Sequence, residues 1–83
     1  MINIDFTTKQ DVIHEYKNIL GWKVLLDENR NYHSYNDMPA IIVSNGSKFW
    51  YKHGKLHRDN DLPAIVRSSG TQEYYIDGKF IRR

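Results

Sequence analysis

Two histidine–aspartate pairs with identical spacing are the residues whose chemistry would suit metal binding or acid–base catalysis. His33 precedes Asp37 by four positions, and His57 precedes Asp61 in the same way. Zinc usually takes three or four ligands, and on a strand-to-loop segment this spacing does not place both side chains on one face. Because the pair is repeated, we expect its imidazole and carboxylate to satisfy backbone groups in the loop. His53 adds a third ligand near His57 but occupies a turn position, so the sequence predicts no metal site and no cofactor.

The residues needed for nucleophilic catalysis are missing from the sequence. There is no cysteine and no Gly-x-Ser-x-Gly motif, and the run Ser-Ser-Gly at 68–70 is typical of a turn. The run Asn-Gly-Ser-Lys at 45–48 is too short, and wrongly placed, for a phosphate-binding loop that opens a helix. The carboxylates of Asp59 and Asp61 are expected to bind a backbone amide or an arginine. We therefore predict that the protein is not an enzyme and has no catalytic residues.

Basic and aromatic residues that recur in both copies of a repeated segment form a second candidate site, for binding a partner. Lys55 and Lys79 occupy equivalent positions, as do Arg58 and Arg82, so each pair should mark a row across consecutive units. Such rows could bind a protein, or follow a nucleic-acid backbone while neighbouring rings stack on bases. The alternative is structural, since lysines at a sheet edge discourage aggregation and tyrosines often lie in the core. The predicted partner-binding residues are Trp50, Tyr51, Lys52, Lys55, Arg58, Tyr74, Tyr75, Lys79 and Arg82.

The repeated segment has a period of 24 residues. Residues 33–43 return with few changes as residues 57–67, and the register continues through Gly46 and Gly70. A fixed period in this range is typical of stacked supersecondary units, which usually build binding surfaces rather than active sites. About two and a quarter units are present, and the opening half of the first differs most from the others.

Two kinds of element are expected to carry these residues. Over residues 7–21, apolar side chains recur at helical spacing, a threonine can cap the start and Gly21 can stop the end, which predicts an amphipathic helix. From Trp22 onward the pattern changes to short strands separated by two-residue turns that contain glycine. The predicted strands lie near 22–27, 40–44, 47–52, 55–57, 64–67, 71–76 and 79–82. Strand 79–82 would be an open edge, able to form a homodimer or to extend a partner's sheet.

Differences between the two copies indicate where the helix would pack. Val43 and Phe49 of the first copy are replaced by Arg67 and Glu73 in the second, on one alternating face of the strands. That face should therefore be dry in the first copy and wet in the second. We expect the helix to lie across the first copy and to cover Ile41, Val43 and Phe49.

Bulk composition bounds the class of protein. The 83 residues predict a single domain, 1–83, with an N-terminal segment and helix at 1–21 and hairpin repeats at 22–83. A net charge of +2 is too small to identify a nucleic-acid-binding protein by itself. The start has no signal-peptide pattern, and no apolar run approaches the roughly 20 residues of a membrane span. We expect a cytoplasmic protein without a membrane partner.

The run 48–65 resembles a repeat module of bacteriophage and giant-virus proteins. In this chain the module is written as Trp-Tyr, a turn with glycine, Lys, an apolar residue, His-Arg, an acidic stretch and Pro-Ala. The resemblance covers residues 25–83 and is related in period and layout to MORN-like repeats. The chain departs from the module at Arg30, Ser34 and Ile81, where Gly, Arg and His would stand.

This resemblance implies an α+β fold in which the N-terminal amphipathic helix packs on an antiparallel β-meander of MORN-like 24-residue hairpin repeats. It further implies a small phage accessory protein that acts in the host cytosol without catalysis. The expected function is binding to a host protein or defence complex, as an inhibitor of the anti-CRISPR type. The alternative is an accessory protein that binds nucleic acid through the basic and aromatic strip.

Overall fold

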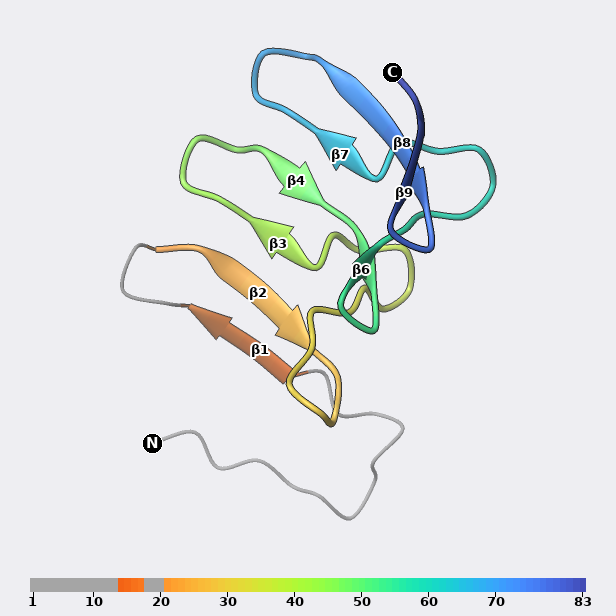
Figure 1. The fold of residues 1–83 in the computed structure, drawn as a ribbon. Helices are drawn as coiled ribbons and strands as arrows, with labels where there is room; N and C mark the ends of the chain where they lie inside the picture. The colour runs from red at the N-terminus through yellow and green to blue at the C-terminus, as the bar shows by residue number, and fades with distance from the viewer. Residues whose placement is uncertain (1–13, 18–20) are drawn as a thin grey trace.

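The computed structural model describes residues 14–17 and 21–83, which form strands joined by turns and loops. The strands are β1 (His14–Lys17), β2 (Lys23–Leu26), β3 (Ile41–Ile42), β4 (Lys48–Phe49), β5 (Tyr51–Lys52), β6 (Lys55–Leu56), β7 (Ile65–Val66), β8 (Gln72–Ile76) and β9 (Lys79–Arg82). Seven of them form one antiparallel sheet in the order β1-β2-β3-β4-β7-β8-β9, and β5 pairs with β6. In Figure 1 the hairpins follow one another along the sheet, and the loops at 43–47 and 67–71 lie at the same end of the strands.

The prediction of an α+β fold with an N-terminal helix is wrong. His14–Lys17, the middle of the predicted helix, is strand β1 and pairs antiparallel with β2, with Glu15 opposite Leu25. The other predicted helical positions, 7–13 and 18–20, lie outside the described residues. β-Branched and aromatic residues around β1 suit a strand as well as a helix, and pairing with β1 gives β2 hydrogen-bonding partners on both edges.

The face that the helix was expected to cover is packed by the sheet's own side chains. Val24, Ala40 and Ile41 are buried at its centre. The partly buried side chains around them are Trp22, Leu26, Val43, Phe49 and Tyr51. The described part of the chain has no helix long and apolar enough to cross a membrane.

The second copy was expected to be wet on this face, but Glu73 is buried there. Its Oε2 accepts a hydrogen bond from Nε of Arg67 at 3.0 Å. The two residues that replace Phe49 and Val43 therefore form an ion pair, which compensates the buried charge.

Glycine positions set two kinds of turn. In loop 43–47, the N–H groups of Val43 and Gly46 bond to the carbonyls of Ser47 and Val43, and Gly46 has φ of 93°. This is a three-residue hairpin loop rather than the predicted two-residue turn, and loop 67–71 makes the same two bonds. Between β5 and β6, both turn residues, His53 and Gly54, have positive φ, as expected for a two-residue type I′ turn.

The first unit contains one additional turn residue, and this shifts its register. Arg30 takes a φ of 65° at the end of a three-residue loop, where the other units have two-residue turns. As a result Leu25, rather than Leu26, occupies the position of Trp50: the N–H of Leu25 bonds to Ala40 just as that of Trp50 bonds to Ala64. Strand β2 is therefore displaced by one residue from the 24-residue alignment.

Candidate functional site

Arg58 lies between Trp50 of its own hairpin and Asp37 of the preceding loop. Its guanidinium carbon is 3.9 Å from the centroid of the Trp50 ring, and Nε and Nη2 are each 3.0 Å from an oxygen of Asp37. Trp50 is buried, and its Nε1 donates to the carbonyl of Asp37 at 2.9 Å. The hydrogen bond from Arg58 lowers the pKa of Asp37 below its ordinary value. Two residues predicted to bind a partner are thus used to join two units.

The same arrangement returns 24 residues later. The guanidinium carbon of Arg82 is 3.8 Å from the Tyr74 ring centroid, and Nη2 is 2.9 Å from Oδ1 of Asp61. The aspartates of both His-x-x-x-Asp motifs therefore bind the arginine of the next unit and not the histidine of their own.

The remaining predicted partner-binding residues divide into buried rings and exposed cations. The ring of Tyr51 is half-buried against Tyr32, with centroids 5.2 Å apart, and that of Tyr75 meets the edge of Phe80. The lysines predicted to bind a partner (Lys52, Lys55 and Lys79) are exposed.

His33 and His57 perform one task at successive junctions between units. Nδ1 of His33 accepts the backbone N–H of His53 at 2.9 Å, and Nδ1 of His57 accepts that of Asp77 at 3.0 Å. A ring nitrogen that accepts carries no proton, so the neutral ring is protonated on Nε2. In His57 this Nε2 lies 2.7 Å from Asp59. The histidines satisfy backbone groups as expected, but in the turn of the following hairpin rather than in their own loop.

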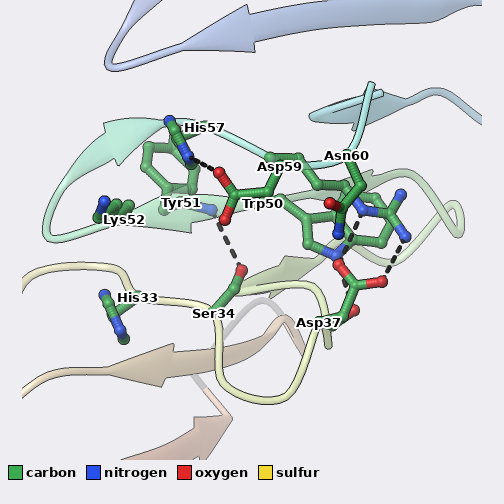
Figure 2. Close-up of a pocket in the computed structure, with 10 residues that line it drawn as sticks. His33, Ser34, Asp37, Trp50, Tyr51, Lys52, His57, Asp59 and Asn60 are labelled. Atoms are coloured by element: carbon green, nitrogen blue, oxygen red, sulfur yellow. Dashed lines mark hydrogen bonds and ion pairs between the residues drawn. The ribbon is translucent and has the colours of Figure 1, made fainter. Parts of the chain in front are cut away.

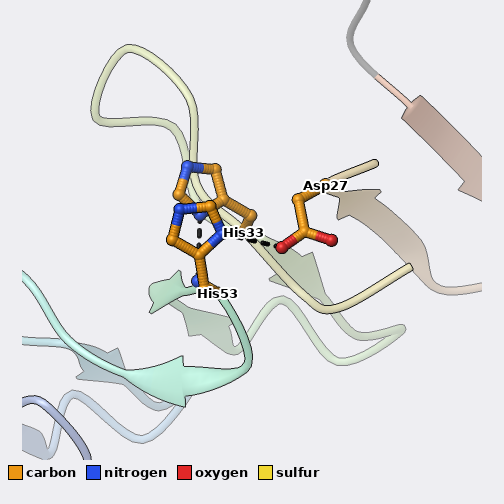
Figure 3. A group of neighbouring side chains, drawn as sticks. All are labelled: Asp27, His33 and His53. Carbon is orange, nitrogen blue, oxygen red and sulfur yellow. Dashed lines mark hydrogen bonds and ion pairs between the residues drawn. The ribbon is translucent and has the colours of Figure 1, made fainter. Parts of the chain in front are cut away.

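The structure also brings together Asp27, His33 and His53, shown in Figure 3. Each offers one metal-ligating atom, and these atoms lie within 4.8 Å of one another. Sequence reasoning placed His53 near His57 and missed Asp27, because the added turn residue puts Asp27 at the position of Lys52. Only a register that allowed for this insertion would have revealed the cluster.

The ligand atoms of this cluster are already used by protein hydrogen bonds. Asp27 is 3% exposed, its Oδ1 accepts two backbone N–H groups of its own turn, and its Oδ2 lies 2.7 Å from Nδ1 of His53. Burial raises the pKa of Asp27, but these hydrogen bonds outweigh burial and hold it at about 2. Burial lowers the pKa of His33, and the nearby charge of His53 acts in the same direction. A metal ion would have to displace several of these bonds.

A cavity of about 360 Å³ opens between the loop of the first unit and the hairpin of the second. Figure 2 shows Lys52 and His33 near one end and Asp59 on the other side. The hydroxyl in it belongs to Ser34, whose Oγ accepts the backbone N–H of Tyr51 at 3.1 Å. The cavity has charges of both signs, and its hydroxyl is not paired with a general base.

The last hairpin exposes large apolar side chains. Phe80 is 54% and Ile81 is 53% exposed, and Ile76 is exposed beside them. The equivalents of Phe80 and Ile81 in the second unit, Leu56 and His57, are half-buried and buried, because the next hairpin packs on them. The sequence analysis named the edge strand but not these two side chains; the signal was the replacement of histidine by Ile81.

Comparison with known protein families, curated proteins and solved structures gave no match to this chain.

Proposed function

We propose that this protein is a non-catalytic protein-binding module whose binding surface is the last hairpin, β8–β9. The observation that carries the proposal is the exposure of Phe80 and Ile81 at positions where the preceding unit is covered by a hairpin. An apolar surface bordered by polar residues is typical of an interaction site. The resemblance to phage repeat modules suggests that the partner is a host protein or defence complex, which binding would inhibit.

Binding is better supported than catalysis by the state of the ionisable groups. The carboxylates and imidazoles that cluster in the fold are engaged with backbone N–H groups or arginines. Groups held in this way stabilise junctions between units and are poorly placed to exchange protons with a substrate.

Nucleic-acid binding is less well supported, because both arginines of the basic strip have partners. Arg58 is paired with Asp37 and Arg82 with Asp61. A phosphate would have to compete with these carboxylates, which leaves the exposed lysines as the available cations.

The test is affinity capture from nuclease-treated bacterial lysate with three forms of the tagged protein. We expect wild type and Leu62→Asp to retain the same partner and Phe80→Asp to lose it. Leu62 is a matched control because it is an exposed apolar residue, at 37%, in a loop outside the last hairpin. Capture of nothing above background, or of a partner that survives in Phe80→Asp, would contradict the proposed surface.

A further inference from the structure

Consecutive units dock through backbone hydrogen bonds that repeat at both junctions. At the first junction, the N–H of Gly54 bonds to the carbonyl of Tyr32 at 2.8 Å, and that of Ser34 to the carbonyl of Tyr51 at 2.7 Å. The segment after each turn therefore pairs on its outer edge with the end of the next hairpin, as an added strand would.

The second junction uses the same atoms 24 residues later. Gly78 bonds to the carbonyl of Leu56 at 2.8 Å, and Arg58 to the carbonyl of Tyr75 at 3.3 Å. The outer edge of β6 is thus occupied by the end of β8 and its turn. Strand β9 is the next position in this series.

The register of β9 turns its backbone toward a further strand. Ile76 and Lys79 flank the two-residue turn, so they form the hydrogen-bonded pair that closes the hairpin. Hydrogen-bonded and non-hydrogen-bonded pairs alternate in antiparallel strands, which makes Tyr75–Phe80 a non-hydrogen-bonded pair. The N–H and carbonyl of Phe80 therefore face the outer edge, as the carbonyl of Leu56 does.

The side chains on β9 argue against a second copy of this chain as the occupant. At both internal junctions a histidine Nδ1 accepts an N–H of the incoming turn, and Ile81 has no acceptor to offer. A turn of this chain docked there would bury an unsatisfied donor. Pairing β9 with itself so that Phe80 meets Ile81 would set Lys79 opposite Arg82, a repulsion between like charges.

The charges around β9 indicate the chemistry of the occupant. Lys55 lies against the turn at Gly78, and its side chain and those of Lys79 and Arg83 are exposed. We propose that the outer edge of β9 binds an extended segment of a partner protein in which acidic and apolar residues alternate, by antiparallel strand addition. Apolar side chains of the segment meet Phe80 and Ile81, and its carboxylates meet the lysines. This inference rests on the proposed protein-binding function and specifies its mode.

Synthetic peptides test the inference directly. The probe is a fluorescein-labelled peptide of about ten residues in which glutamate and valine alternate, a typical strand length. Its matched control replaces each glutamate with lysine. Fluorescence anisotropy should show the acidic peptide binding at least about tenfold more tightly than the basic one, an effect that weakens as salt rises. Equal affinity for the two peptides would overturn the inference.

Two changes separate side-chain from backbone contacts. Phe80→Asp should reduce the affinity for the acidic peptide by about tenfold or more, whereas Leu62→Asp should leave it unchanged. A peptide N-methylated at alternate residues should lose binding to the wild-type protein, because it cannot complete the strand hydrogen bonds. This second measurement needs no variant to fold, and undiminished binding of the methylated peptide would rule out strand addition.

Other occupants give distinguishable results. A dimer in sedimentation analysis that Ile81→Asp dissociates would assign the edge to a second copy. Displacement of the acidic peptide by a single-stranded oligonucleotide would assign it to nucleic acid. Capture of a protein that depends on Lys52 but not on Phe80 would retain the binding module and refute the role of β9.

Discussion

Arg58 and Asp37 join two consecutive units through a two-point ion pair, with Nε and Nη2 each 3.0 Å from one carboxylate oxygen. The guanidinium also covers the buried ring of Trp50, so one side chain connects a loop, a hairpin and the core. This contact explains why an arginine that looks like a binding residue in the sequence is a structural one in the fold.

Arg58→Lys is expected to destabilise the protein although the charge is kept. A lysine cannot bind both carboxylate oxygens or stack its plane on Trp50, so we expect a loss of about 1–2 kcal/mol in urea unfolding. Arg83→Lys, at an exposed position, is the control and should change the free energy of unfolding little. Equal stability of the two variants would show that Arg58 does not join the units.

Asp27→Ala should be more destabilising than its short side chain suggests. The change leaves two backbone N–H groups and His53 without their buried acceptor, for which we expect a loss of about 2–3 kcal/mol. Asp59→Ala removes a carboxylate that is exposed at 75% and should lose under about 1 kcal/mol. Thermal and urea unfolding of both variants measure the difference, and a smaller effect at Asp27 than at Asp59 would contradict the role given to it.

Stability should fall in two stages as the pH is lowered. The pKa of His33 lies below its ordinary 6.5 in the folded protein, so the unfolded chain binds this proton more tightly. Its contribution is fully present above about 6.5 and is lost as the pH falls from there through the folded-state value. The pKa of Asp27 falls from 3.8 to about 2 on folding, so its contribution is lost over that lower range.

Urea unfolding between pH 8 and pH 3 measures both stages. His33→Asn offers an amide oxygen that can accept the His53 N–H without titrating, so the upper stage should disappear while the lower remains. An upper stage that persists unchanged in this variant would assign it to another group.

Zinc should not stabilise the protein through Asp27, His33 and His53. Metal binding would require the bond between Asp27 and His53, and the proton on Nε2 of His33 or the bond to its Nδ1, to be given up. We expect the Tm to be unchanged by added Zn²⁺ and by EDTA in scanning calorimetry. A rise of several degrees that His53→Ala abolishes would show that the cluster does hold a metal.

The backbone of His14–Lys17 should give the signature of a strand in solution. We expect extended secondary chemical shifts at these residues and cross-strand contacts between the backbones of Tyr16 and Val24. Helical shifts at 14–17 would restore the interpretation that the sequence pattern first favoured.

The comparison between sequence and structure shows which signals are local. Glycines predicted the turns because positive φ is a property of single residues, and most strands followed from the turns. The helix failed because a short apolar run does not separate helix from strand until its partner, β2, is known. The contact between Asp27 and His53 was unpredictable, since it joins residues 26 apart and depends on one added turn residue.

The repeated hydrogen bonds between units have a consequence for engineering. A module that presents the same donors and acceptors at its two ends can in principle be duplicated in frame, and the folding energy of such arrays grows by a roughly constant increment per unit. A chain lengthened by one 24-residue period should therefore unfold at higher denaturant concentration, provided that the new junction retains a histidine. The imidazole at each junction thus acts as a connector that sets how many hairpins the protein can hold in line.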